Sequence, residues 1–355
     1  MQKQRIPFIA LALLSLLAGL LTGLHRIGWA LPLDSVSRDH GSIMIGGFLG
    51  TLISLEKVIP LKRRTVYVIP LISSASVVMF FLNLPAYSVI ALIIASVGLA
   101  TVFVIYWLRE RSLIYWLMSA GAACWLTGNV LLLTNTFYPL SVPWWMAFVL
   151  LIIAAERLEL MKFLPVTPKQ KTLFALMLAV FVVACLLTFH GPGSYIASLA
   201  LITTSLWLMR YDVVGINLKK VGLSRYTGAA LVSGYFSLLI CGLFIPLLSS
   251  QPLGYDAIVH SFFIGFVFAM IFAHGPIILP GVLGISAKPY HPVLYLWLLL
   301  LHASWISRAL ADIALAMPLR RYSGVVSMIA ITGYFISMII LLFVSQRSAS
   351  VAPRQ

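Results

Sequence analysis

The sequence predicts an all-α polytopic membrane protein of about twelve transmembrane helices, arranged in three pseudo-symmetric four-helix arcs. Hydrophobic residues make up 61% of the 355 residues and charged residues only 9%, whereas roughly 25% of the residues of a soluble domain are charged. The mean hydropathy is +1.04. Apolar runs of about 17 to 25 residues, the length that crosses a bilayer, recur along the whole chain. These observations exclude a soluble globular domain.

The apolar runs give the expected helices in order. The first run follows Lys3 and Arg5 as a signal peptide would, but it is longer than the roughly 7 to 15 apolar residues of such a peptide. No small-x-small cleavage site precedes His25, so we expect this run to be retained as a helix. The expected spans are residues 6–24, 41–59, 66–83, 86–108, 113–133, 143–161, 172–189, 194–210, 227–248, 257–281, 291–313 and 323–345.

The distribution of Lys and Arg predicts the orientation, because positively charged connections stay on the cytoplasmic side. With the N-terminus inside, nineteen of the 24 Lys and Arg residues fall in inner segments. We therefore expect a multi-pass protein of a bacterial cytoplasmic (inner) membrane, in contact with the lipid bilayer, with both termini in the cytoplasm. The net charge of +15 is spread over the connections rather than gathered in one basic domain, so no nucleic-acid partner is expected. The outer basic residues are Arg26, Arg38, Arg308, Arg320 and Arg321.

A recurring pattern indicates an internal repeat within one transmembrane domain, residues 1–355. A small residue and a Phe, followed after seven residues by a polar residue, occur three times. We expect repeats at approximately residues 1–110, 111–220 and 221–345, with a tail at 346–355. The three copies are Gly47-Phe48 to Glu56, Ala147-Phe148 to Glu156, and Gly265-Phe266 to His274.

Two histidines, His40 and His260, each enter an apolar span from the expected outer side. A histidine in hydrocarbon is unfavourable unless it is paired, ligated or facing water. A pair at matched depth on separate helices therefore predicts a functional site, and axial ligation of one haem iron by both imidazoles is the first hypothesis to test.

The stretches DHGSIMIGGF at residues 39–48 and HSFFIGF at residues 260–266, in a chain of twelve expected spans, resemble subunit I of the haem-copper oxidases. They also resemble the NnrS-like membrane haem proteins associated with nitric-oxide metabolism. The resemblance covers nearly the whole chain and implies a haem held by histidines on helices 2 and 10, near the outer surface. It thus implies a bis-histidine haem b on His40 and His260, serving electron transfer with a redox partner or the handling of a small ligand such as nitric oxide.

The sequence also departs from the oxidases. Their copper and oxygen-reducing site needs a His on helix 6 and a His pair on helix 7, but the sixth expected span has no His and the seventh has none before His190, at its outer end. The His-x-His pattern of their helix 10 is replaced by His260-Ser261-Phe262. The resemblance therefore implies a haem scaffold without the oxidase copper site. Whether the protein is an enzyme is left open.

Two further histidines are candidate metal ligands. His274 lies 14 residues beyond His260, which places it about 21 Å along the helix and about 40° around it. His302 is expected near the middle of the next span. A second haem or a copper ion held by His274 and His302 is one interpretation, and a hydrogen bond from each imidazole to a neighbouring group is the other. His25, His190 and His291 lie at helix ends, where interfacial water can hydrogen-bond to their imidazoles and no functional role is needed to explain them.

Charged residues supply the remaining candidates. Arg38 and Arg308 are candidate partners of haem propionates, and Asp39 could orient the His40 imidazole. Arg308 and Asp312, four residues apart, are more simply expected to pair with each other. Glu56 and Glu156 lie at the inner boundary beside basic residues, as structural groups, as a proton entry or as an inner polar site shared with His274. Glycines 46, 47 and 50 allow close helix packing or the approach of a flat macrocycle. The three cysteines are interpreted as buried apolar residues.

Two other classes of function remain open. A cofactor-free secondary transporter or permease could use the histidines and inner carboxylates as a pathway, although transporters are usually built from paired repeats rather than three. A scaffold subunit without cofactor would keep the fold, and replacing its His40 would change neither its spectrum nor its function.

Overall fold

The computed structural model describes residues 2–187, 189, 191–286 and 288–351. Within these residues the chain is all-helical, with no strand. Twelve helical spans in this part are long and apolar enough to cross a membrane. All twelve overlap the expected spans, so the predicted fold class, a polytopic membrane protein, is confirmed. The spans are Ile6–Arg26, Ser37–Leu61, Arg64–Phe81, Pro85–Arg109, Leu113–Asn135, Tyr138–Phe163, Pro168–Leu186, Pro192–Tyr211, Leu223–Leu248, Gly254–Leu283, Val293–Ile313 and Met317–Ser345.

The chain forms two compact units, one of Ile6–Ala197 and one of Ser198–Gln355 with Met1–Arg5. We call these the first and the second unit and describe each by itself. The three repeats expected from the sequence stay a prediction. Helices of the first unit are α1 (Ile6–Arg26), α2 (His40–Ser42), α3 (Thr51–Val58), α4 (Val68–Phe81), α5 (Pro85–Arg109), α6 (Leu113–Asn135), α7 (Tyr138–Leu160) and α8 (Pro168–Leu186). Helix α9 (Pro192–Tyr211) begins in the first unit, and the second holds α10 (Val214–Leu218), α11 (Leu223–Leu248), α12 (Gly254–His260), α13 (Ala269–Leu283), α14 (Val293–Ile313) and α15 (Met317–Val351).

Local sequence explains where several helices begin. Pro85, Pro168 and Pro192 each occupy the first helical position, where the missing N–H of proline costs no intrahelical bond. At α8 the Thr167 side chain accepts from the Gln170 N–H, and the Gln170 side chain accepts from the Thr167 N–H, which forms a capping box.

Two spans contain a π-helix, in which the turn is wider than in an α-helix. These are η3 (Ile43–Gly50) in the second span and η7 (Ser261–Phe268) in the tenth. Phe48 and Phe266 are each the sixth residue of their π-helix, so the matched Gly-Phe pairs lie in the same register. The predicted correspondence of these two spans stays a prediction. The third copy of the pattern lies in α7, which is α-helical throughout.

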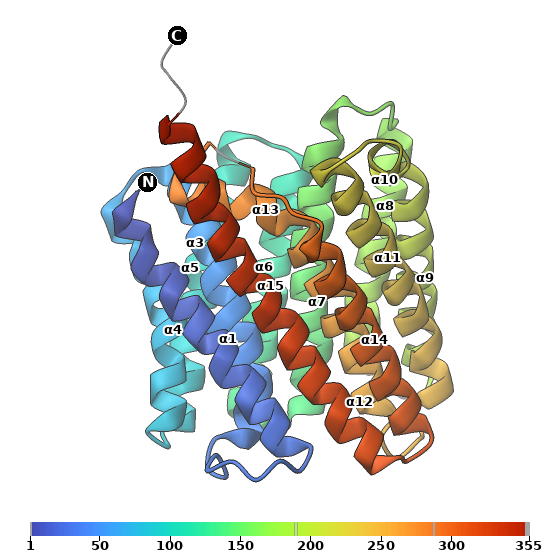
Figure 1. Ribbon diagram of the computed structural model, residues 1–355. Coiled ribbons are helices and arrows are strands. Elements are labelled where there is room, and N and C mark those ends of the chain that lie inside the picture. Colours follow the sequence, from blue (N-terminus) through green and yellow to red (C-terminus); the bar gives the residue numbers. More distant parts are fainter. Residues whose placement is uncertain (1, 188, 190, 287, 352–355) are drawn as a thin grey trace. The chain divides into compact units, whose positions relative to one another are not determined.

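Small residues bring the second span close to its neighbours in the first unit, where α1, α4 and α5 are packed side by side (Figure 1). A Cβ atom added at Gly46 would collide with Leu92, and one added at Gly47 would collide with Val77. At Gly50 it would lie 2.6 Å from Cζ2 of Trp125. Trp125 is fully buried and its ring stacks on that of Phe148 at 5.0 Å. These glycines therefore serve helix packing, one of the two roles expected for them.

Replacing Gly50 by Ala should destabilise the protein by about 1–3 kcal/mol, because the stacked Trp125 ring cannot retreat from the added methyl group. The measurement is the thermal unfolding temperature of the purified protein in detergent. Gly281→Ala is the matched control, since nothing lies within 4 Å of a Cβ at that helical position. Equal unfolding temperatures for the two variants would contradict the packing role.

Candidate functional site

His40 lies at the start of the second span and contacts α1. Its Nδ1 is 2.7 Å from the carbonyl oxygen of Gly19 and 3.4 Å from Oγ1 of Thr22. A carbonyl oxygen can only accept, so Nδ1 carries the proton and donates it to Gly19. Gly23 permits this approach, because a Cβ there would lie 2.8 Å from Cε1 of His40. The neutral imidazole consequently has its lone pair on Nε2, the form in which a histidine binds a metal through that nitrogen.

His260 has the same tautomer in the second unit. Its Nδ1 lies 2.9 Å from the backbone carbonyl oxygen of Asp256, one helical turn earlier, and 3.4 Å from Oδ1 of the same residue. The proton is therefore on Nδ1 and the lone pair on Nε2. The side chain is 18% exposed. His260 and His40 thus share two features: a backbone carbonyl that fixes the tautomer, and a π-helix that begins within three residues along the chain.

The carboxylate of Asp39 interacts with side chains other than the imidazole expected from the sequence. It accepts a hydrogen bond of 2.8 Å from the hydroxyl of Tyr138 and lies 3.7 Å from Nε of Arg38. The acceptor that orients His40 through Nδ1 is the Gly19 carbonyl, because α1 presents its backbone at that point. The side chain of Arg38 is 70% exposed, so its role toward a haem propionate stays a prediction.

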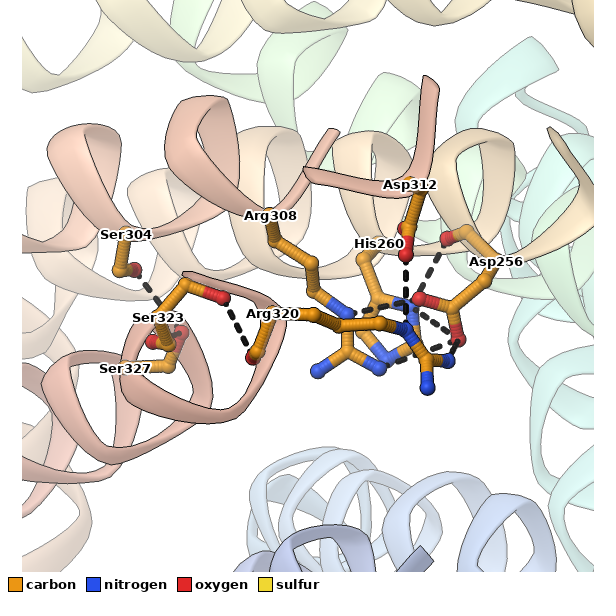
Figure 2. A network of polar contacts seen from close by, with 8 residues as sticks. All are labelled: Asp256, His260, Ser304, Arg308, Asp312, Arg320, Ser323 and Ser327. Carbon is orange, nitrogen blue, oxygen red and sulfur yellow. Dashed lines mark hydrogen bonds and ion pairs between the residues drawn. The ribbon is translucent and has the colours of Figure 1, made fainter. Parts of the chain in front are cut away.

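A network of charged side chains surrounds His260 (Figure 2). Arg308 of α14 donates to Asp256 through two nitrogens, at 2.7 Å and 3.0 Å. Arg320 of α15 donates to Asp312 at 2.7 Å and also lies 3.3 Å from Asp256. The expected pairing of Arg308 with Asp312 is therefore wrong. Each residue instead pairs across helices, where burial leaves the carboxylates few other donors.

Arg308 was also a candidate partner of a haem propionate. Two of its nitrogens already bind the Asp256 carboxylate, so a propionate would have to take the remaining edge of the guanidinium. This role stays a prediction, and the geometry does not favour it.

The two remaining metal candidates, His274 and His302, lie at different levels of the second unit. Ser237 of α11 lies 3.5 Å from Nδ1 of His302, whereas Thr227 of the same helix donates to the carbonyl oxygen of Ala273. Ten residues of α11 separate these two contacts, which corresponds to about 15 Å. A single ion shared by His274 and His302 is therefore not favoured.

The tautomer of His302 also differs from that of His40 and His260. The indole Nε1 of Trp305 donates to Nδ1 of His302 at 2.9 Å, so the proton of a neutral ring is on Nε2. The Nδ1 atom of His274 lies 2.8 Å from the carbonyl oxygen of Met270. In the part of the chain that the structure describes, no three His, Cys, Asp or Glu residues are grouped as a metal site.

A second charged cluster lies at the expected inner boundary, within the first unit. Nζ of Lys57 lies 2.8 Å from Glu56 and 2.7 Å from Glu156. The exposed fractions of the three side chains are 13% for Lys57, 28% for Glu56 and 19% for Glu156. One cation thus bridges two carboxylates from α3 and α7, a link that the sequence did not predict. The triad joins the second and sixth spans.

The other histidines and the cysteines do not belong to these clusters. His25 lies 3.2 Å from Asp34, and the exposed His291 accepts from the N–H of Val293. His190 lies outside the described residues. Cys124, Cys185 and Cys241 are buried and free, as expected.

Comparison with models of known protein families assigns the chain to one of them. The family model described as "Domain of unknown function (DUF8744)" matches residues 5–343, so the chain belongs to this family. The matched range includes both His40 and His260. No curated protein matches the sequence.

Replacing Lys57 by Met should leave the carboxylates of Glu56 and Glu156 facing each other without their cation. We expect a loss of about 1–3 kcal/mol, the usual effect of leaving a buried polar group unpaired, measured as a lower unfolding temperature in detergent. Lys162→Met is the control, because that lysine is 47% exposed and lies 4.0 Å from Glu159; its effect should be within about 0.5 kcal/mol. If both variants unfold at the same temperature, the triad does not stabilise the fold.

Proposed function

We propose that this member of the DUF8744 family is a haem-binding membrane protein in which His40 and His260 supply the axial ligands of a b-type haem. One observation carries the proposal: each histidine donates its Nδ1 proton to a backbone carbonyl, of Gly19 and of Asp256. A metal-ligating histidine almost always donates its other ring N–H to a carbonyl, carboxylate or water. The residues present therefore fit the ligand role that the resemblance to oxidase subunit I implies.

The chemistry that a haem supplies is one-electron transfer or the binding of a small ligand at the iron. Two histidine ligands leave the iron no open position, which favours electron transfer with a redox partner over the handling of nitric oxide. The protein residues orient the two imidazoles through Nδ1. Phe48 and Phe266, both fully buried, follow the two histidines within their π-helices.

The protein purified from haem-supplied cells should show a Soret band that shifts on reduction. His40→Ala and His260→Ala should each abolish the low-spin spectrum, because each removes an axial nitrogen. His291→Ala, at an exposed loop position, is the control and should leave the spectrum unchanged. A colourless wild-type protein would falsify the proposal and would favour the cofactor-free transporter or scaffold.

The proposal places the protein in a bacterial cytoplasmic membrane with both termini inside, supported by the distribution of positive charge. Single cysteines test this orientation, since the three native cysteines are buried. In intact cells a membrane-impermeant maleimide should label Asp34→Cys, whose native side chain is 92% exposed. It should label Lys219→Cys, also at an exposed position, only in inside-out vesicles. The reverse pattern would mean that the orientation is inverted.

A further inference from the structure

We infer that Asp256 is a positioning residue of His260 whose carboxylate sets the electron density of that imidazole. The inference rests on the proposed haem-ligand role of His260 and assigns the residue that tunes it. For this role the carboxylate must lie close to Nδ1 and must be held there by other side chains. It must also raise the basicity of the imidazole more than a neutral acceptor would.

The carboxylate is close to Nδ1. Asp256 approaches the imidazole from one helical turn earlier, with its backbone oxygen at 2.9 Å and its Oδ1 at 3.4 Å from Nδ1. The Nδ1 proton therefore lies between a carbonyl oxygen and an anionic oxygen of the same residue. The backbone oxygen fixes the direction of the N–H bond, and the carboxylate adds negative charge beside it.

Three cross-helix contacts hold the carboxylate in place. Nε and one terminal nitrogen of Arg308 bind one oxygen each, at 2.7 Å and 3.0 Å, in the two-pronged arrangement that gives an Arg–carboxylate pair a defined geometry. Arg320 adds a contact of 3.3 Å to Oδ1, the oxygen nearest the imidazole. With Arg308 only 8% exposed and Asp256 21% exposed, the pair is largely shielded from water.

Asp312 completes the charge balance. Its side chain is fully buried and binds Nε of Arg320 at 2.7 Å. Two arginines thus face two aspartates in one network (Figure 2). The serines of α14 and α15 support the same arrangement, because Ser327 donates to Ser304 at 2.8 Å and joins the helices that carry the two arginines.

The two histidines differ in this respect. His40 donates to the neutral carbonyl of Gly19, with the neutral hydroxyl of Thr22 as the second nearby group. His260 also has a carboxylate oxygen 3.4 Å from Nδ1. Because a carboxylate beside the N–H group of a ligating imidazole raises its basicity, the Asp256 carboxylate would make His260 a stronger electron donor toward a bound iron. Net charge and outer hydrogen bonds are among the factors by which a protein sets a haem potential.

The test is the haem midpoint potential in three variants of the full-length, haem-loaded protein. Asp256→Asn keeps the backbone acceptor of His260 and should retain the low-spin spectrum, but it removes the anionic oxygen and should raise the potential. Asp312→Asn changes the other carboxylate of the same network without touching the imidazole, so its rise should be clearly smaller. Arg320→Gln removes a cation that lies 3.3 Å from Oδ1 and should lower the potential.

The outcomes separate this inference from the proposed function. A wild-type protein that binds no haem refutes both. Haem bound through His260 with an unchanged potential in Asp256→Asn, or with equal rises in Asp256→Asn and Asp312→Asn, overturns the inference and leaves the ligand role intact. If Asp256→Asn does not accumulate, Arg320→Gln decides alone: a lower potential supports the inference, and an unchanged potential overturns it.

Discussion

Every polar group that a chain carries into hydrocarbon has to find its partner within the protein, because lipid offers none. The helices satisfy the backbone, and hydroxyl groups such as that of Thr22 donate to carbonyl oxygens one turn earlier in their own helix. The histidines obey the same constraint. His40 donates to a carbonyl of a neighbouring helix and His260 to one of its own, so the pairing that makes each imidazole tolerable in an apolar span also decides which nitrogen keeps its lone pair.

The charged residues follow the same rule by sharing partners across helices. Lys57 lies between two glutamates, and Asp256 lies between two arginines. Each cluster joins helices that are distant in sequence, and each brings opposite charges together. A buried charge without its partner would be strongly unfavourable, so these clusters also restrict how the helices of each unit can rotate or slide.

The two π-helices lie in the spans that contain His40 and His260. A π-helical turn is usually found where a function requires it, since its wider geometry is less favourable than that of an α-helix. Here η3 and η7 place Gly47-Phe48 and Gly265-Phe266 in the same register. The repeat pattern of α7, which lacks a histidine, also lacks the π-helix. The irregular turn therefore accompanies the histidine rather than the Gly-Phe or Ala-Phe pattern alone.

The sequence by itself determined the number and position of the spans, because bilayer thickness imposes a length and an apolar composition that can be read residue by residue. Asp256 was missed from the sequence, although a spacing of four from His260 places both residues on one helix face. Only the tertiary structure decided that Gly19 accepts from His40, that Lys57 bridges to Glu156, and that Arg308 pairs with Asp256 rather than Asp312. These choices depend on how each helix is rotated about its axis and on which backbone atoms its neighbour presents, and hydropathy carries no information about either.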